Sequence, residues 1–134
     1  MSKFYLIGKF STKDKIRELI KEVENIGFHV THNWTLEENF TCPKSEQVEN
    51  DINGVIAADF VIAIIDNKKY HYRGSFAEIG CALGLDKSVY LVTNNLEDGS
   101  AQHCFLFHKN IIRFQTWKGL TKFLKYQYKC IKKS

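Results

Sequence analysis

The segment Asp59-Phe-Val-Ile-Ala-Ile-Ile-Asp66 places the strongest constraint on the fold of this 134-residue chain. Its apolar run, residues 60–65, is far shorter than the roughly 20 residues that cross a bilayer. A strand that is apolar at every position must be covered on both sides. The segment therefore predicts the central strand of a parallel sheet that lies between two layers of helices.

Strand-like and helix-like segments alternate around this run. We expect further strands at 3–8, 28–32, 88–93 and 110–114, and helices at about 11–26, 45–58, 74–85 and 117–132. This alternation is typical of an α/β fold with right-handed crossovers, and 2-1-3-4-5 is the simplest order for five strands. The length and the 44% hydrophobic content suit one core, so we expect one domain over residues 1–134.

Ligands of such sheets bind at the carboxyl ends of the strands. In this chain that edge comprises residues 8–12, 32–36, 66–75 and the segment from Thr93 onward. Residues 94–108 form a long irregular loop at the same edge, where they could cover a site.

The charge is distributed unevenly. Residues 1–67 carry 7 basic and 11 acidic side chains, whereas residues 68–134 carry 12 and 4. A basic tail can bind nucleic acid. However, the six lysines after Trp117 lie opposite apolar residues at helical spacing, such as Leu120 and Leu124. An amphipathic closing helix with a solvated face is the simpler interpretation, and we do not expect a nucleic-acid partner.

Several common sites and locations are not indicated. Four widely spaced cysteines without a Cys-x-x-Cys pair favour reduced thiols over disulfides or zinc (Cys42, Cys81, Cys104, Cys130). The N-terminus lacks a signal-peptide layout, so we expect a cytoplasmic protein with no membrane partner. Because no Gly-rich dinucleotide loop, Walker loop or metal-ligand cluster is evident, we expect neither a cofactor nor a metal.

Residues 66–80 carry the clearest chemical signal. Asp66 closes the central strand, Arg73 lies in the next loop, and Glu78 is expected in the first turn of a helix, where the dipole favours a carboxylate. Such a carboxylate can attack or stabilise an electrophilic carbon. Ser75 and Glu78 also have the spacing of a capping box, in which Glu78 bonds back to the helix start. The pattern alone leaves both interpretations open.

Asp66 allows a third interpretation, because response-regulator receivers carry their phosphate-accepting aspartate at the end of the third strand. Those domains also need an acidic pair after the first strand and a lysine at the end of the fifth. This chain has Gly8-Lys9-Phe10 and Phe114-Gln115 at those places, so a receiver is disfavoured.

Four motifs follow one another between residues 4 and 83: Phe4-Tyr-Leu-Ile-Gly-Lys-Phe10, Asn50-Asp-Ile-Asn-Gly-Val55, Ala58-Asp-Phe-Val61 and Gly74-Ser-Phe-Ala-Glu-Ile-Gly-Cys-Ala-Leu83. In this order and spacing the chain resembles the nucleoside 2-deoxyribosyltransferases and their nucleoside 5′-monophosphate N-glycosidase relatives. The resemblance implies a flavodoxin-like three-layer sandwich. It also implies a transferase or hydrolase of nucleotide salvage that acts on the N-glycosidic bond of 2′-deoxynucleosides.

The resemblance further implies catalytic roles for three residues. Glu78 would be the nucleophile that attacks the anomeric carbon, Tyr5 would orient it, and Asp51 would contact the base. In glycosidase chemistry a carboxylate stabilises an oxocarbenium-like transition state while a second group protonates the leaving group. A 2-deoxy sugar suits this reaction, because it lacks the electron-withdrawing hydroxyl beside the reacting carbon.

Tyr72 departs from the family pattern. Six residues before the glutamate, the transferases carry an aspartate and the monophosphate N-glycosidases a serine. The base preference and the choice between transfer and hydrolysis therefore stay open. The expected substrate-binding residues lie in loops at the same sheet edge: Gly8, Lys9, Phe10, Trp34, Asp66, Tyr72, Arg73, Gly74 and Ser75.

A phosphorylated substrate is one alternative. Basic and hydroxyl side chains gather where a loop enters a helix N-terminus, which is a natural anion site, although each of them also suits a cap or a solvated surface (Lys9, Ser11, Thr12, Lys13, with Arg73).

Trp34 offers a flat stacking surface for a base or a cover for the core. His32 and His71 are candidate proton carriers, but histidines in loops are more often exposed bystanders.

Two other functions use the same fold. The chain could be a non-catalytic nucleotide-binding module, or it could cleave another N-riboside. Family members assemble so that neighbouring chains complete one another's sites, so we expect a homo-oligomer, a dimer or larger. The aromatic-rich segment 104–108 is a candidate contact, and Asn94 or Asn95 is a candidate for reaching a neighbour's sugar.

Overall fold

A computed structural model describes residues 2–37, 44–67, 69–94 and 99–133 of the chain. Five strands, β1 (Lys3–Ile7), β2 (His29–Val30), β3 (Phe60–Ile64), β4 (Ser88–Val92) and β5 (Ile111–Phe114), form one parallel sheet. The strand order is β2-β1-β3-β4-β5, which confirms the order expected from the sequence.

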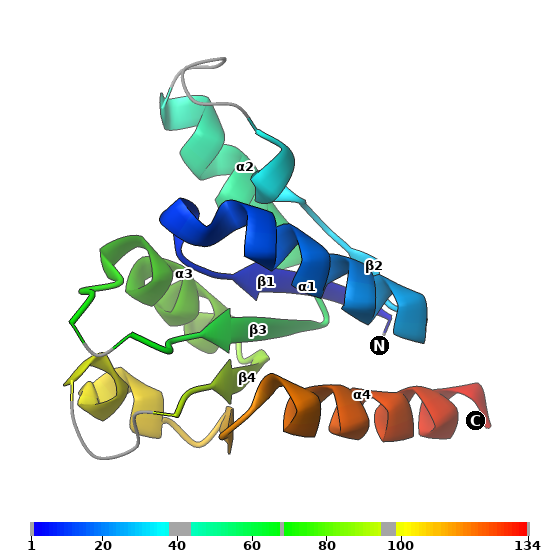
Figure 1. The fold of residues 1–134 in the computed structure, drawn as a ribbon. Helices are drawn as coiled ribbons and strands as arrows, with labels where there is room; N and C mark the ends of the chain where they lie inside the picture. Colours follow the sequence, from blue (N-terminus) through cyan, green and yellow to red (C-terminus); the bar gives the residue numbers. More distant parts are fainter. Residues whose placement is uncertain (1, 38–43, 68, 95–98, 134) are drawn as a thin grey trace.

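Four helices complete the α/β architecture: α1 (Lys13–Ile26), α2 (Lys44–Ala57), α3 (Arg73–Gly84) and α4 (Trp117–Lys132). As Figure 1 shows, α1 and α4 cover one face of the sheet, and α2 and α3 cover the other. Short 3-10 turns lie at Phe10–Thr12, Trp34–Leu36, Gly99–Gln102 and Cys104–Phe107. The chain therefore has the expected three-layer arrangement.

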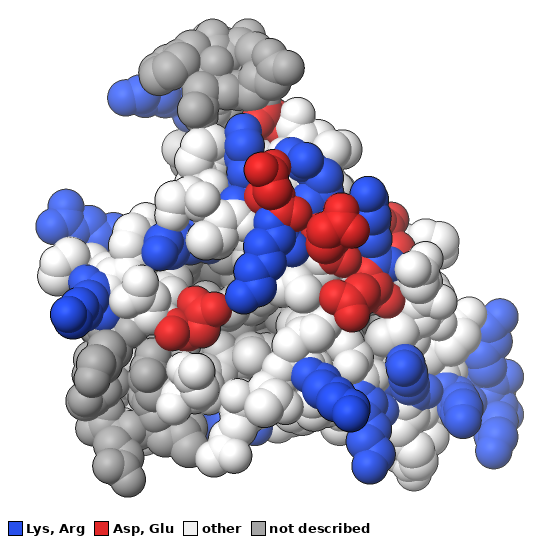
Figure 2. Space-filling model, viewed as in Figure 1, with Lys and Arg blue, Asp and Glu red and all other residues white. Residues whose placement is uncertain are grey.

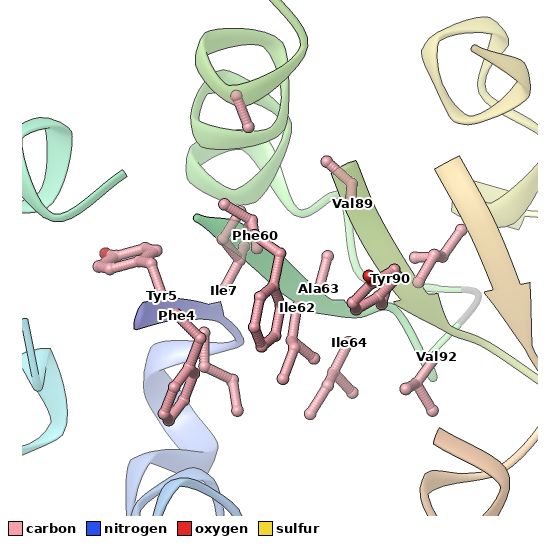
Figure 3. Close-up of a cluster of buried hydrophobic side chains, with 14 of the residues drawn as sticks. Phe4, Tyr5, Ile7, Phe60, Ile62, Ala63, Ile64, Val89, Tyr90 and Val92 are labelled. Atoms are coloured by element: carbon pink, nitrogen blue, oxygen red, sulfur yellow. The ribbon is translucent and has the colours of Figure 1, made fainter. Parts of the chain in front are cut away.

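The apolar run is the central strand, as expected. All five residues of β3 are buried, and β3 pairs with β1 on one side and β4 on the other. Figure 3 shows Phe4 and Ile62 on one side of the sheet and Tyr5 and Ile7 on the other. Each side of β1 and β3 therefore packs under its own helical layer, and Tyr5 faces the α2–α3 layer.

Two segments differ from the expected ones. β2 is only two residues long. Phe28, before it, packs against Phe60, and the Thr31 hydroxyl, after it, donates to the Gly54 carbonyl oxygen at 2.6 Å. The segment 94–108, expected to be an irregular loop, contains two 3-10 turns within its described part. Residues 95–98, and with them Asn95, lie outside the described residues.

The start of α3 corrects a more consequential expectation. The helix begins at Arg73 after Tyr72, whose backbone is left-handed with φ 53°, and no side chain caps it. Ser75 is therefore inside the first turn, and the capping box with Glu78 does not form. Glu78 lies in the second turn instead of the first.

The closing helix is amphipathic, as expected. Leu120 and Leu124 are buried, and Tyr128 packs against the core. The lysines of α4 gather on its outward face, at the lower right of Figure 2. None of the described helices is long and apolar enough to cross a membrane. No disulfide forms among the cysteines at 81, 104 and 130, and Cys42 lies outside the described residues.

Candidate active site

A cavity of about 180 Å³ lies at the carboxyl end of β1. The loops that follow β1, β2 and β3 surround it, together with α2 and the start of α3. It contains every residue that the sequence marked as catalytic or substrate-binding except Asp66 and Arg73. It also contains Tyr70, which the sequence analysis did not single out. The lining is Tyr5, Gly8, Lys9, Phe10, Trp34, Asp51, Tyr70, Tyr72, Gly74, Ser75 and Glu78.

Tyr5 joins two carboxyl groups in this cavity. Its side chain is 1% exposed, and its hydroxyl has hydrogen bonds to both Glu78 and Asp51. Burial, followed by the charges of Glu78 and Asp51, raises the pKa of Tyr5 far above its ordinary value. Tyr5 is therefore a neutral hydrogen-bond donor at every pH at which the protein would work.

Glu78 is partly buried, and its Oε2 has no hydrogen-bond partner among the described residues. Burial raises the pKa of Glu78 to about 7; the hydrogen bond from Tyr5 opposes this change, and the nearby Asp51 charge adds to it. Burial, and not the helix dipole that the sequence suggested, thus sets the protonation state. Near neutral pH the carboxyl group is divided between its acid and its carboxylate.

Asp51 contacts a second set of polar side chains. Its Oδ1 lies 3.5 Å from His32 Nε2, and the same nitrogen lies 2.7 Å from Glu37 Oε1. Burial and then the charge of Glu37 raise the pKa of Asp51, whereas His32 and Tyr5 lower it. The nitrogen and oxygen atoms of these three side chains all lie within 4.8 Å of one another.

Gly54 explains how Asp51 reaches Tyr5. A Cβ at Gly54 would lie 2.8 Å from Tyr5 Cδ1 and 2.9 Å from His32 Cβ, so only glycine lets α2 approach β1 so closely. Asp51 lies three residues earlier on α2, and positions i and i+3 share one face of a helix. The close approach therefore directs Asp51 into the cavity.

Residues 4–112 match the family model described as nucleoside 2-deoxyribosyltransferase. The chain belongs to this family. No protein with a curated function matches the sequence.

Several solved structures have the same fold as this chain, although their sequence identity to it is low. The CMP N-glycosidase BcmB of Clostridium botulinum matches with a TM-score of 0.65 at 19% identity, over 94% of this chain and 99% of that one. A 2-deoxyribosyltransferase of Bacillus psychrosaccharolyticus matches with a TM-score of 0.63 at 19% identity, over 90% of both chains. A 2-desoxiribosyltransferase of Leishmania mexicana has a TM-score of 0.64 at 13% identity, over 94% of this chain and 99% of that one.

Tyr72, where this deoxyribosyltransferase-family chain departs from the pattern, fixes the loop after β3. Its side chain is 1% exposed, and its hydroxyl accepts from the backbone N–H groups of Asp66 and Asn67 at 3.2 and 3.1 Å. The hydroxyl also donates to Asp66 Oδ1 at 3.1 Å. The ring of Tyr72 thus lines the cavity, while its hydroxyl is hydrogen-bonded to Asp66.

Aromatic rings form one wall of the family member's cavity. Trp34 is 8% exposed, and its Nε1–H donates to the Leu6 carbonyl oxygen at 2.7 Å. The Phe10 ring lies nearly parallel to it, with 6.3 Å between the ring centroids. Both interpretations of Trp34 are thus compatible with its position, because the ring covers the core and also lines the cavity.

The residues suggested for phosphate binding divide between two hollows that share Lys9. Lys9 lines the cavity, with Nζ 4.8 Å from the centroid of the Tyr70 ring. Together with Thr12 it also lines a second hollow of about 290 Å³ between α1 and the start of α4, and Lys13 lies over the Phe10 ring. Arg73 is exposed at the first residue of α3, outside the cavity lining.

Sequence reasoning missed Glu37 and undervalued His32. Glu37 follows the 3-10 turn Trp34–Leu36 in a polar stretch, and nothing in its local pattern distinguishes it from a solvated acid. His71, the other candidate proton carrier, is exposed and does not line the cavity. The useful signal for His32 was its position at the carboxyl edge of the sheet, directly after β2.

Proposed function

We propose that the protein cleaves or transfers the N-glycosidic bond of 2′-deoxynucleosides with Glu78 as the nucleophile. The observation that carries this proposal is the Tyr5 hydroxyl, which hydrogen-bonds to Glu78 and Asp51 inside one cavity. Family membership supports the reaction class, and the cavity supplies the groups that the reaction needs.

The single hydroxyl proton of Tyr5 divides the two carboxyl groups into different roles. A hydroxyl donates to one acceptor at a time, so the second carboxyl group bonds to Tyr5 well only when it is itself protonated. The arrangement therefore suits a pair that holds one carboxylate and one carboxylic acid. Glycosidic cleavage needs such a pair, because the carboxylate attacks the anomeric carbon and the carboxylic acid gives a proton to the leaving base.

In the proposed reaction Glu78 attacks the anomeric carbon as the bond to the base breaks. The electron pair of that bond goes to the base, which takes a proton from the Asp51 carboxylic acid. The glycosyl ester on Glu78 is then opened by a second base, which restores a nucleoside, or by water, which releases the free sugar. The rings of Trp34 and Phe10 provide an apolar wall for the base.

Chromatography of deoxynucleosides incubated with the protein, with and without an acceptor base, tests the proposal. Base exchange is expected for a transferase and free base for a hydrolase, and Glu78→Ala should abolish both. Saturable binding without any product from wild-type protein would contradict the proposal and support a non-catalytic nucleotide-binding module. A parallel series with ribonucleosides tests cleavage of another N-riboside.

A nucleoside 5′-monophosphate is the second candidate substrate, because cationic and helix-start groups line the same cavity. Lys9 brings a positive charge, and Gly74 and Ser75 belong to the first turn of α3, whose free N–H groups attract anions. One of the structural neighbours is itself described as a CMP N-glycosidase.

Lys9→Ala separates the two substrates. If a monophosphate is bound, kcat/KM for the nucleotide should fall by about 10-fold or more while that for the nucleoside changes little. Arg73→Ala serves as a comparison, since Arg73 is outside the cavity lining. An unchanged preference in Lys9→Ala would contradict phosphate recognition by this side chain.

A further inference from the structure

His32 lies between two acids directly behind the proposed catalytic pair. It follows β2, whereas Glu37 ends the turn Trp34–Leu36 and Asp51 comes from α2. The three side chains are only partly accessible, with 23%, 24% and 31% exposed, respectively. Asp51 in turn bonds to Tyr5, so a continuous set of polar groups extends from His32 to Glu78.

The distances favour proton exchange over metal binding. The 2.7 Å between His32 Nε2 and Glu37 Oε1 is the length of a hydrogen-bond contact. Two ligands that each lie 2.0–2.1 Å from a tetrahedral zinc ion would be about 3.3 Å apart. The imidazole nitrogen and the carboxylate oxygen are therefore closer together than two ligands of one zinc ion would be, and their distance, though not yet their alignment, is that of a hydrogen bond.

His32 Nε2 and Asp51 Oδ1 lie close together but do not form an aligned hydrogen bond. His32 Nε2 and Asp51 Oδ1 are both buried, and neither has an aligned hydrogen bond among the residues that the structure describes. Their separation of 3.5 Å can shorten by a small rotation of either side chain. Hydrogen bonds at catalytic sites are often long in a ligand-free protein and tighten with substrate bound.

We propose that His32 relays the proton that Asp51 gives to the departing base, which extends the proposed function of this site. As the base leaves with the Asp51 proton, Asp51 Oδ1 takes the proton from the His32 imidazolium, which becomes neutral. In the second half of the reaction Asp51 first passes the proton on Oδ1 back to His32. Asp51 then takes a proton from the attacking base or water, which restores the starting state.

The groups that face His32 define its electrostatic surroundings. Glu37 and Asp51 contact its Nε2, and Tyr5 and Glu78 lie beyond Asp51. The remaining neighbour that the structure identifies is Gly54, whose missing side chain leaves room for His32 Cβ. Two acids thus lie against one imidazole nitrogen, and one of them, Asp51, leads on to the proposed catalytic pair.

Substrates that differ in leaving-group quality test the relay. The best 2′-deoxynucleoside is compared with an activated analogue, N7-methylated for a purine or 5-nitro-substituted for a pyrimidine, whose base leaves with little help from a proton. His32→Gln should lower kcat for the ordinary nucleoside by about 10- to 100-fold and for the activated analogue by less than about 3-fold. In wild-type protein, kcat should fall at high pH with the ordinary substrate only.

His29→Gln is the matched control, because His29 is exposed on β2, and it should behave like wild type with both substrates. Wild-type protein that cleaves both substrates while His32→Gln loses both equally would overturn the relay alone. Wild-type protein inactive on both would overturn the N-glycosidic function and the relay with it. Loss of wild-type activity in EDTA, with recovery on adding zinc, would also overturn the relay, because the three side chains would then hold a metal.

Discussion

Glu78 combines two properties that oppose each other. A carboxyl group that is shielded from water is a stronger nucleophile when ionised, but the same shielding makes ionisation costly. Its pKa of about 7 lies above the ordinary value of 4.5, so the folded protein holds this proton more tightly than the unfolded chain does. The contribution to stability is complete below pH 4.5 and is lost as the pH rises through about 7.

Glu78→Gln should therefore be inactive but more stable. The amide stays neutral, so at pH 8 the free energy of unfolding should exceed that of wild type by about 1–3 kcal/mol. The difference should shrink as the pH is lowered toward 5. Urea denaturation at pH 5 and pH 8 measures it, and an equal difference at both pH values would contradict the burial of an ionisable Glu78.

Tyr5→Phe should lower activity and move its pH dependence. The hydrogen bond from Tyr5 lowers the pKa of Glu78, so its removal raises that pKa further. We expect kcat to fall by about 10- to 100-fold, the value of a hydrogen bond to a charged group. The acid limb of kcat/KM should shift to higher pH.

Tyr90→Phe is the control for this change, because Tyr90 is a buried tyrosine on β4, 6% exposed, that is not part of the cavity lining. It should keep the wild-type pH profile. An unchanged profile in Tyr5→Phe would show that this hydroxyl does not govern the ionisation of Glu78.

At this scale the family motifs name individual residues, but they do not reveal partners that are distant in the chain. The motifs brought Tyr5, Asp51 and Glu78 forward, and the structure places all three in one cavity. Tyr72 was expected among the substrate-binding residues; its ring lines the cavity, whereas its hydroxyl binds backbone N–H groups of a loop. Local sequence does not reveal such a partner.

At the scale of elements, the approach of α2 to β1 depends on one missing side chain. Gly54→Ala would place a Cβ 2.8 Å from the Tyr5 ring, which cannot retreat because it is fully packed. We expect a loss of about 1–3 kcal/mol in stability, as for other overpacked cores, and a lower kcat because α2 carries Asp51 away from Tyr5. Thermal denaturation and activity measure the two effects.

Gly80→Ala is the comparison, since an added Cβ on α3 would meet no atom within 4 Å. It should raise stability by about 0.5–1 kcal/mol through helix propensity and leave kcat unchanged. Similar effects in the two variants would contradict the specific role of Gly54.

The order and type of the elements followed from hydrophobic pattern, but two boundaries did not. β2 ends after Val30, just before Thr31, whose hydroxyl donates to the carbonyl oxygen of Gly54 on another element. α3 starts at Arg73, directly after the left-handed backbone of Tyr72. A local pattern of apolar residues contains no information about either feature.

At the scale of the whole molecule, two exposed aromatic residues suggest how chains associate. Phe105 and Phe107 are 55% and 61% exposed on the turn Cys104–Phe107, within the segment that the sequence analysis marked as a candidate contact. We expect the protein to sediment as a dimer or larger species, and Phe105→Glu should shift it toward monomer because a charge would be buried in the contact.

Tyr126→Glu provides a matched control, because Tyr126 is 66% exposed on α4, away from that segment. It should leave the sedimentation coefficient unchanged. A monomeric wild type, or equal behaviour of the two variants, would contradict association through the turn.

The whole sheet was the most predictable feature, because the fully apolar β3 allows few topologies. A parallel strand buried on both faces requires crossovers on both sides, and these restrict the strand order. The cavity was less predictable, because its lining comes from β1 and three separate crossovers and depends on how far each loop projects.

The division of the sheet into two covered faces has a practical consequence. The candidate chemistry lies under α2 and α3, whereas the lysine-rich surface of α4 belongs to the opposite layer (Figures 1 and 2). A support or a dye attached to the outward face of α4 would therefore leave the cavity mouth accessible to small molecules.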